Sequence, residues 1–203
     1  KEFELNFASD NVTEASQEIL DAIIAANSGS MMPYGNDSIT KKVTTMVQEI
    51  FERDVAVYLV STGTAANAIS ISCLTQNYGS IFCHWDSHVY DDECGAPEFF
   101  CGGAKLIPIN GNLGKIDLSA LEHHARRGRG DVHMTQPSAV SITQMTELGT
   151  VYSISEVTSI GDYCQSNKLK LHMDGARFAN AIAPLQCTPA ELTWKAGVDV
   201  LTF

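Results

Sequence analysis

The sequence contains no long apolar run and no signal-peptide core. A membrane-spanning helix needs roughly 20 consecutive apolar residues, and no segment of the chain approaches that length. The first ten residues also lack the apolar stretch that a secretory signal requires. We therefore expect a cytoplasmic protein that does not bind membranes.

Paired cysteines are also missing. The six cysteines lie at irregular spacings, and none of them forms a C-x-x-C motif. A disulfide framework or a zinc site would normally show short, paired spacings in a smaller chain. The cysteines are therefore interpreted as mostly buried, reduced thiols of a cytosolic protein, and no metal site is expected.

Basic residues are scarce. The chain has 13 Lys and Arg against 24 Asp and Glu, which gives a net charge of −11 and a pI near 4.8. A surface this acidic repels phosphate backbones and anionic lipids, so nucleic acid is not an expected partner. An anionic ligand would have to be held by a local site that works against the overall field.

The sequence does contain strand patterns that alternate with helix patterns, as in an α/β domain. With 203 residues, 44% of them hydrophobic, the chain can bury a sizeable core. Two amphipathic helices are predicted first, over 13–27 and 38–52, and Asp37 or Ser38 can cap the second. From residue 55 onward, short apolar runs typical of buried strands alternate with helical segments. The expected strands are 55–60, 81–84, 105–109, 139–143, 169–174 and 198–203, and the expected helices are 64–76, 117–127, 155–167 and 188–196.

This pattern predicts a mostly parallel sheet flanked by helices. We divide the chain into an N-terminal arm with its helices, residues 1–53, and a large domain, residues 54–203. In such sheets, ligands bind beyond the carboxyl ends of the strands. Polar residues that directly follow the predicted strands are therefore the candidates for a functional site.

A turn rich in small residues and hydroxyl groups follows the strand 55–60. It reads Ser61-Thr62-Gly63-Thr64 and leads into a helix. The free amides and positive dipole of a helix start can hold a phosphate, here with help from the Thr64 hydroxyl. No G-K-[ST] follows, so the turn is not a Walker loop. The alternative is an ordinary capped turn from strand to helix.

A histidine and an aspartate follow two later strands. His84 and His88 stand four residues apart, but their segment reads as a loop without a third metal ligand. A single histidine there is either a structural residue or an imidazole that faces a ligand ring. Asp174 ends the strand 169–174 and would point into the crevice, unless it pairs with Arg177 just behind it.

Taken together, these three features match the layout that binds pyridoxal phosphate. A turn at a helix start would hold the phosphate, and a histidine can stack on the pyridine ring. A carboxylate next to the ring nitrogen keeps that nitrogen protonated, which makes the ring an electron sink. The sequence therefore points to pyridoxal 5'-phosphate as the cofactor.

At this level of detail the sequence resembles the L-threonine aldolases of the bacterial low-specificity group. These are pyridoxal-phosphate enzymes with the aminotransferase-like fold (fold type I). The resemblance covers essentially the whole chain, and its long blocks are far more specific than the T-G-T turn. They are F-A-S-D-N-V-T (7–13), P-Y-G-N-D (33–37), T-G-T-A-A-N (62–67), D-S-H-V-Y-D-D-E-C-G-A-P-E-F-F (86–100), L-H-M-D-G-A-R-F-A-N-A (171–181) and A-E-L-T-W-K-A-G-V-D-V-L-T-F (190–203).

The resemblance implies a role for each matching position. Gly63 and Thr64 would hold the cofactor phosphate. His88 would stack on the pyridine ring and assist proton transfer. Asp174 would face the ring nitrogen, and Arg177 would contact the phenolic oxygen of the cofactor. Two positions are expected to contact or line the substrate site, Ser9 and Tyr34, the latter from a neighbouring subunit.

The chain departs from the family pattern in two places. Some members have a second active-site histidine where this sequence reads Gln144-Met145-Thr146-Glu147, so Gln144 or Glu147 is expected near the site instead. The family's Schiff-base lysine follows the last strand, and we expect it beyond Phe203, as we do the small C-terminal domain. Three nearby lysines are not expected to replace it: Lys168, Lys170 and Lys195.

The resemblance also implies an activity. The expected reaction is the retro-aldol cleavage of L-threonine, L-allo-threonine and related β-hydroxy amino acids to glycine and an aldehyde. Relatives place their active sites at subunit interfaces, so a homo-tetramer or homodimer is expected. Two alternatives stay open: a pyridoxal-phosphate-dependent β-eliminating lyase that acts on aromatic amino acids, and a non-catalytic cofactor-binding paralogue.

Overall fold

The computed structural model describes residues 12–203, and the chain divides into two compact units, Lys1–Thr45 and Met46–Phe203. In the first unit, α1 (Gln17–Ala26) leaves Ile19 and Ile23 of its apolar stripe exposed. Helix α2 (Ser38–Ile50) begins in the first unit and ends in the second. The predicted cap is confirmed, because Asp37 Oδ1 accepts a hydrogen bond from the Thr40 amide at 2.7 Å.

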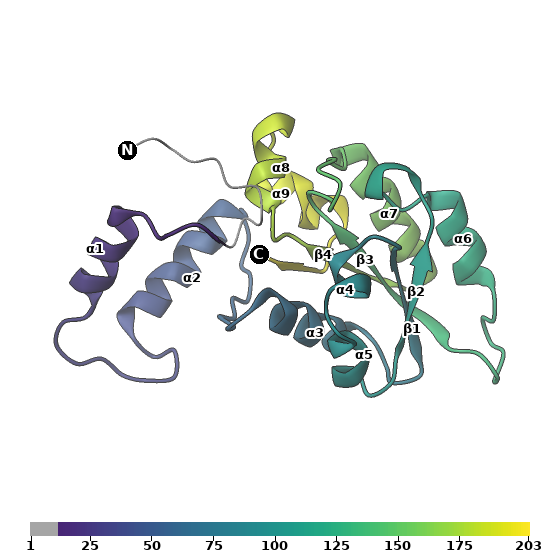
Figure 1. Ribbon diagram of the computed structural model, residues 1–203, viewed down its shortest axis with the longest axis horizontal. Coiled ribbons are helices and arrows are strands. Elements are labelled where there is room, and N and C mark those ends of the chain that lie inside the picture. The colour runs from purple at the N-terminus through teal and green to yellow at the C-terminus, as the bar shows by residue number, and fades with distance from the viewer. Residues whose placement is uncertain (1–11) are drawn as a thin grey trace. The chain divides into compact units, whose positions relative to one another are not determined.

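The second unit is built on one sheet of five strands, all of them parallel, in the order β2-β1-β3-β4-β5 (Figure 1). The order reverses at β1, since β2 lies on one side of it and β3 on the other. Ligand crevices in open α/β sheets form at such a reversal. The strands are β1 (Gly79–His84), β2 (Lys105–Ile109), β3 (Gln136–Thr143), β4 (Lys170–Asp174) and β5 (Val200–Thr202).

Helices cover both faces of this sheet. Figure 1 shows α3 (Gly63–Leu74) and α5 (Ala96–Phe100) on one side and α6 (Leu118–Arg126) and α7 (Ile154–Asn167) on the other. The parallel α/β class expected from the sequence is therefore confirmed. The shorter elements are α4 (His88–Asp91), η2 (Asn112–Gly114), α8 (Phe178–Leu185), α9 (Pro189–Leu192) and η3 (Trp194–Ala196).

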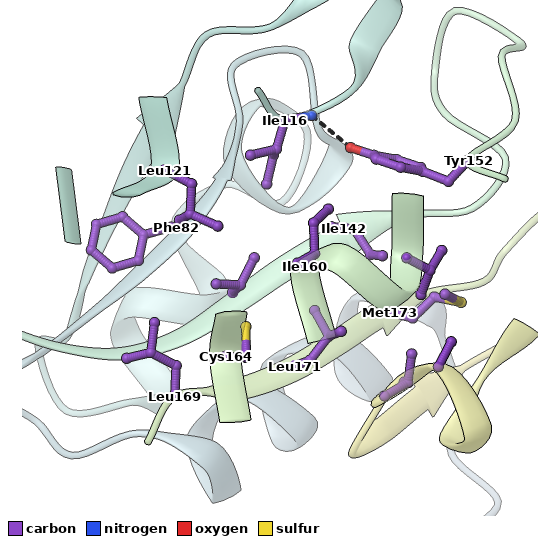
Figure 2. Packing of buried hydrophobic residues seen from close by; sticks show 14 of the residues in the cluster. Phe82, Ile116, Leu121, Ile142, Tyr152, Ile160, Cys164, Leu169, Leu171 and Met173 are labelled. Atoms are coloured by element: carbon purple, nitrogen blue, oxygen red, sulfur yellow. Dashed lines mark hydrogen bonds between the residues drawn. The ribbon is translucent and has the colours of Figure 1, made fainter. Parts of the chain in front are cut away.

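The core follows the alternation of side chains along the strands. Phe82 packs in the cluster that includes residues of α6 and α7, whereas its neighbours Ile81 and Cys83 pack with Ile71 of α3. Figure 2 shows the larger cluster, in which the Tyr152 hydroxyl accepts a 2.6 Å hydrogen bond from the Ile116 amide. The two clusters fix the sheet between its helices and hold the carboxyl ends of the strands in place.

One predicted strand is wrong. The segment 55–60 is not in the sheet, and Tyr58 is 84% exposed. The Gln48 side-chain amide instead donates a 3.2 Å hydrogen bond to the Val55 carbonyl. A continuous apolar run shows that a segment can bury both faces, but it does not supply a neighbouring strand to pair with.

Three helices were not predicted. Helices α4 and α5 have four and five residues, too few to show a 3.6-residue period. Helix α8 contains Pro184, which argues against a helix when only the sequence is read. By contrast, α9 lies within the predicted helix 188–196 and begins with a capping box of Thr188 and Glu191.

All six cysteines are free thiols, but only three of them are buried, namely Cys83, Cys101 and Cys164. The expectation of mostly buried thiols therefore holds for half of them. Among the described residues, no helix is both long and apolar enough to span a membrane.

Candidate active site

Four strands deliver polar side chains to one edge of the sheet. His88 follows β1 and Glu147 follows β3, while Asp174 and Thr202 lie at the ends of β4 and β5. Because all strands are parallel, their carboxyl ends meet at this edge. His88 and Glu147 therefore lie where the strand order reverses, between β1 and β3.

Asp174 is buried, and both of its carboxylate oxygens accept hydrogen bonds. Oδ1 accepts from the Ala176 amide at 3.1 Å, and Oδ2 accepts from Asn67 Nδ2 at 2.8 Å. Each oxygen of Asp174 is therefore paired with a protein donor. The turn after Asp174 requires Gly175, because a Cβ there would lie 2.7 Å from the Thr202 carbonyl oxygen. The Gly175 amide donates a hydrogen bond to that same oxygen, which joins the ends of β4 and β5.

Asn67 links Asp174 to the rest of the site. Its Nδ2 also donates to Glu93 Oε1 at 2.7 Å, and its Oδ1 accepts from the Thr202 hydroxyl at 2.7 Å. The three residues Asn67, Glu93 and Thr202 are all buried. A buried polar group is costly unless it is paired, so this network makes the position of the Asp174 carboxylate well defined.

His88 is held at two points. Its backbone amide donates to Glu147 Oε1 at 2.9 Å, and its Nδ1 lies 2.9 Å from Glu93 Oε1. The His88 side chain remains 43% exposed, whereas the Glu93 side chain is fully buried. The imidazole therefore has an anchored Nδ1 and a ring with surface open to a ligand.

The pKa values of His88 and Glu93 are both raised. Partial burial disfavours the imidazolium, but the hydrogen bond to Glu93 and the charges of Glu93, Asp174 and Asp92 outweigh it and raise the pKa of His88. Burial raises the pKa of Glu93 against the lowering effect of its hydrogen bonds to Asn67 and His88. The pair thus keeps a proton to a higher pH than either group would alone.

The ligand atoms of His88, Glu93 and Asp174 lie within 4.8 Å of one another, close enough for a metal ion. The space between the two carboxylates, however, is bridged by the Asn67 amide, which donates one hydrogen bond to each of them. The amide thus pairs with one oxygen of each carboxylate, while the buried Glu93 Oε2 has no hydrogen-bond partner among the described residues.

Arg177 does not pair with Asp174. Its Nε donates to the Met145 carbonyl at 3.2 Å, and one of its terminal nitrogens lies 3.5 Å from Glu147 Oε1. The alternative in which Asp174 and Arg177 neutralise each other is thus wrong. Both side chains are held in place by other groups and remain available to a ligand.

The turn at Gly63 and Thr64 opens helix α3, as the sequence predicts. Thr62 caps the helix by accepting from the Ala65 amide at 3.1 Å. The first amides of a helix have no intrahelical acceptors, which makes them suitable for an anion. Asn67, which is hydrogen-bonded to Asp174, lies three residues further along α3, about 4.5 Å along the axis.

Two of the candidate polar residues are structural. His84 Nδ1 accepts from the Asp86 amide at 3.1 Å, and Nε2 lies 3.3 Å from the Gly111 carbonyl oxygen. Gln144 makes two hydrogen bonds to the backbone of Tyr152. His84 and Gln144 therefore have structural roles, whereas His88 and Glu147 lie at the candidate site. Glu147 contacts both His88 and Arg177.

The structure does not test the two expected substrate residues. Ser9 lies outside the described residues. Tyr34 belongs to the first unit, where its side chain is 97% exposed. Their roles stay predictions.

Sequence reasoning missed Asn67, Glu93 and Thr202. Each lies within a motif that carried the family resemblance, at a position where its own type gives no signal. An asparagine on a helix and a threonine in a strand are ordinary residues. Only the tertiary contacts between α3 and the strand ends show what they do.

A buried carboxylate that is hydrogen-bonded to a residue near a helix start, with a partly exposed imidazole close by, is typical of α/β domains that bind small phosphorylated ligands. Comparison with known proteins makes this class specific. The chain belongs to the beta-eliminating lyase family, whose family model matches residues 6–203.

Relatives in this group include threonine aldolases. A low specificity L-threonine aldolase from a Pseudomonas species is 46% identical over 197 residues, which cover 97% of this chain and 57% of that enzyme. One from Saccharomyces cerevisiae is 32% identical over 178 residues, which cover 86% of this chain and 45% of that enzyme. The chain thus spans about half the length of these relatives.

Solved structures agree with the fold. A threonine aldolase from Leishmania major superposes with a TM-score of 0.84 and 29% identity, covering 89% of this chain and 53% of that one. An alanine–glyoxylate aminotransferase from Nostoc superposes with a TM-score of 0.65 and 15% identity, covering 93% of this chain and 46% of that one. At that identity the second match shows the fold alone, and it agrees with the aminotransferase-like fold expected from the sequence.

Proposed function

We propose that this chain forms the cofactor-binding part of a pyridoxal-phosphate-dependent L-threonine aldolase. The observation that carries the proposal is the position of Asp174, which is buried and hydrogen-bonded to Asn67 near the start of α3. The names of its relatives support the same reaction class. On this basis, the substrates are L-threonine, L-allo-threonine and related β-hydroxy amino acids.

The residues present fit the cofactor. Gly63 and Thr64 offer helix-start amides for its phosphate, and a Cβ built at Gly63 would meet no atom within 4 Å, so this turn is open to a ligand. The Asp174 carboxylate has lone pairs left for a protonated ring nitrogen. When bound, pyridoxal phosphate supplies a ring that takes up the electron pair of a bond broken at Cα of an amino acid.

His88 would lie against the pyridine ring and exchange a proton. Because Glu93 occupies Nδ1, the nitrogen left for proton transfer is Nε2. We assign to this nitrogen the removal of the β-hydroxyl proton, directly or through a water molecule. Arg177, held by Glu147 and the Met145 carbonyl, would donate to the phenolic oxygen of the cofactor.

The overall reaction balances without a further reactant. The β-hydroxyl loses its proton, the Cα–Cβ bond breaks, and Cα gains a proton, so L-threonine gives glycine and acetaldehyde. We include in the proposal a cytoplasmic homo-oligomer of two or four subunits. Ser9 would hold the substrate carboxylate and Tyr34 would line the site of a neighbouring subunit, with residues 1–53 as the arm and 54–203 as the large domain.

The test is a product assay on the full-length protein, with pyridoxal phosphate added. Incubation with L-threonine should release acetaldehyde and glycine in equal amounts. The competing function is a β-eliminating lyase, which the name of the matching family favours. That enzyme would release ammonia from an aromatic amino acid and no aldehyde from threonine, so ammonia without acetaldehyde would overturn the proposal.

A further inference from the structure

We propose that Asn67 is a positioning residue that keeps a proton on the ring nitrogen of bound pyridoxal phosphate rather than on Asp174. This inference rests on the proposed function, because it concerns the same cofactor. It adds a residue that neither the motifs nor the family roles pointed to, and it gives the start of α3 a second task beyond holding a phosphate.

The orientation of the Asn67 amide follows from its three partners. Two of them, Glu93 Oε1 and Asp174 Oδ2, are carboxylate oxygens that need a donor, and both lie on the Nδ2 side at 2.7 and 2.8 Å. The third partner is the Thr202 hydroxyl, which donates to Oδ1 at 2.7 Å. The opposite orientation would set the amide oxygen against two acceptors, so the network admits one arrangement.

The amide therefore uses both of its N–H donors inside the protein. Both N–H groups of Asn67 go to carboxylates, and the residue is buried. A hydrogen bond to a charged acceptor stabilises the charged form more than the protonated form. Donation from Asn67 thus favours the ionised Asp174, and a proton shared between Asp174 and a pyridine nitrogen is displaced toward the nitrogen.

The other charged groups around Asp174 do not donate a hydrogen bond to it. Glu93 is itself an acid, and Arg177 points to Glu147 and the Met145 carbonyl. His88 interacts with Asp174 through its charge alone, since its Nδ1 pairs with Glu93. The partner on the other carboxylate oxygen is the Ala176 amide, a backbone donor that no side-chain substitution removes. Among the described residues, Asn67 is therefore the side chain whose donation to Asp174 can be deleted.

The experiment reads the protonation state of the ring nitrogen directly. The full-length protein is loaded with ¹⁵N-labelled pyridoxal phosphate, and the ¹⁵N chemical shift is compared with those of free pyridinium and neutral pyridine. Wild-type protein should give the pyridinium shift. The variant Asn67→Leu, which keeps the branching at Cγ but removes both donors, should move the shift toward neutral pyridine. A merely structural role for Asn67 would leave the shift unchanged.

Two further variants make the result decisive. Thr202→Val removes the hydroxyl that fixes the amide and should move the shift in the same direction by a smaller amount. It therefore decides the question if Asn67→Leu does not fold. Ser72→Ala, at a partly exposed position of the same helix, is the control and should give the wild-type shift. A pyridinium shift in wild type that persists in Asn67→Leu, or in Thr202→Val if the first variant is unfolded, overturns the inference. Failure of wild-type protein to bind the labelled cofactor overturns the proposed function itself.

Discussion

The backbone amide of His88 donates a 2.9 Å hydrogen bond to Oε1 of Glu147, and this bond joins the segments that follow β1 and β3. The same oxygen lies 3.5 Å from a guanidinium nitrogen of Arg177. One carboxylate therefore fixes both the histidine proposed for the ring face and the arginine proposed for the phenolic oxygen. The bond spans the point where strand order reverses, so it ties together the two sides of the ligand crevice.

Glu147 should consequently affect cofactor binding without touching the cofactor. Replacing Glu147 by Ala removes the acceptor for His88 and the partner of Arg177, and we expect the dissociation constant of pyridoxal phosphate to rise about tenfold. Glu147→Gln keeps an acceptor for the amide, so its effect should be smaller. Absorbance titration of the full-length protein measures both constants. Glu122→Ala, which breaks an exposed pair with Arg126, is the control, and a Glu147→Ala protein with the same affinity as that control would contradict the role.

Glu93 should set the pH dependence of the reaction through His88. Its carboxylate helps to raise the pKa of His88, so a step that needs a neutral imidazole should quicken as the pH rises through that pKa. In Glu93→Gln the negative charge is gone, the pKa of His88 falls, and the rising limb of kcat/KM should move to lower pH. Histidine NMR of the cofactor-free protein should show the same downward change in the His88 titration. An unmoved limb together with an unmoved titration would show that Glu93 does not act on the ring.

Asp174 is the residue on which turnover should depend most strongly. Removing its carboxylate in Asp174→Ala deletes the partner of the ring nitrogen, and we expect kcat for L-threonine to fall by about a hundredfold or more. The fold should survive, since Asp174 is a polar residue at the end of its strand rather than part of the hydrophobic clusters. Acetaldehyde release measures the rate, and circular dichroism checks the fold. Near-normal turnover by the folded variant would contradict the ring-nitrogen role.

The sequence was informative where a single segment contains its own signal. The strands from β1 to β5 contain apolar runs, with helices between most of them. Asp174 is the last residue of β4, and His88 lies in the segment that follows β1. The exposed segment 55–60 has the same kind of run, but pairing depends on a neighbour that its own residues do not specify. The roles of Asn67 and Thr202 could not be predicted from the sequence for a related reason. They lie 135 positions apart, and only the packing of α3 on the strand ends brings them together.

His172 makes the fold sensitive to acid. This residue is fully buried on β4, two positions before Asp174, with Nδ1 2.9 Å from the Ser141 hydroxyl. Burial disfavours the charged ring, and although Asp174 acts in the opposite sense, the pKa of His172 falls to about 4 from 6.5. Between about pH 4 and pH 6.5, His172 therefore binds a proton in the unfolded chain but not in the folded chain. Stability from this residue is complete above about pH 6.5 and is lost as the pH falls toward 4.

The expected loss follows from the two pKa values. Lowering the pH from 7 to 5 should cost the wild-type protein about 2 kcal/mol of unfolding free energy through His172. In His172→Leu this contribution is absent, so the difference between the two pH values should shrink by about that amount. Urea unfolding at both pH values measures the difference. His123→Gln, at an exposed position on α6, should behave as wild type does. If His172→Leu loses as much stability at pH 5 as wild type does, the buried imidazole is not the source of acid sensitivity.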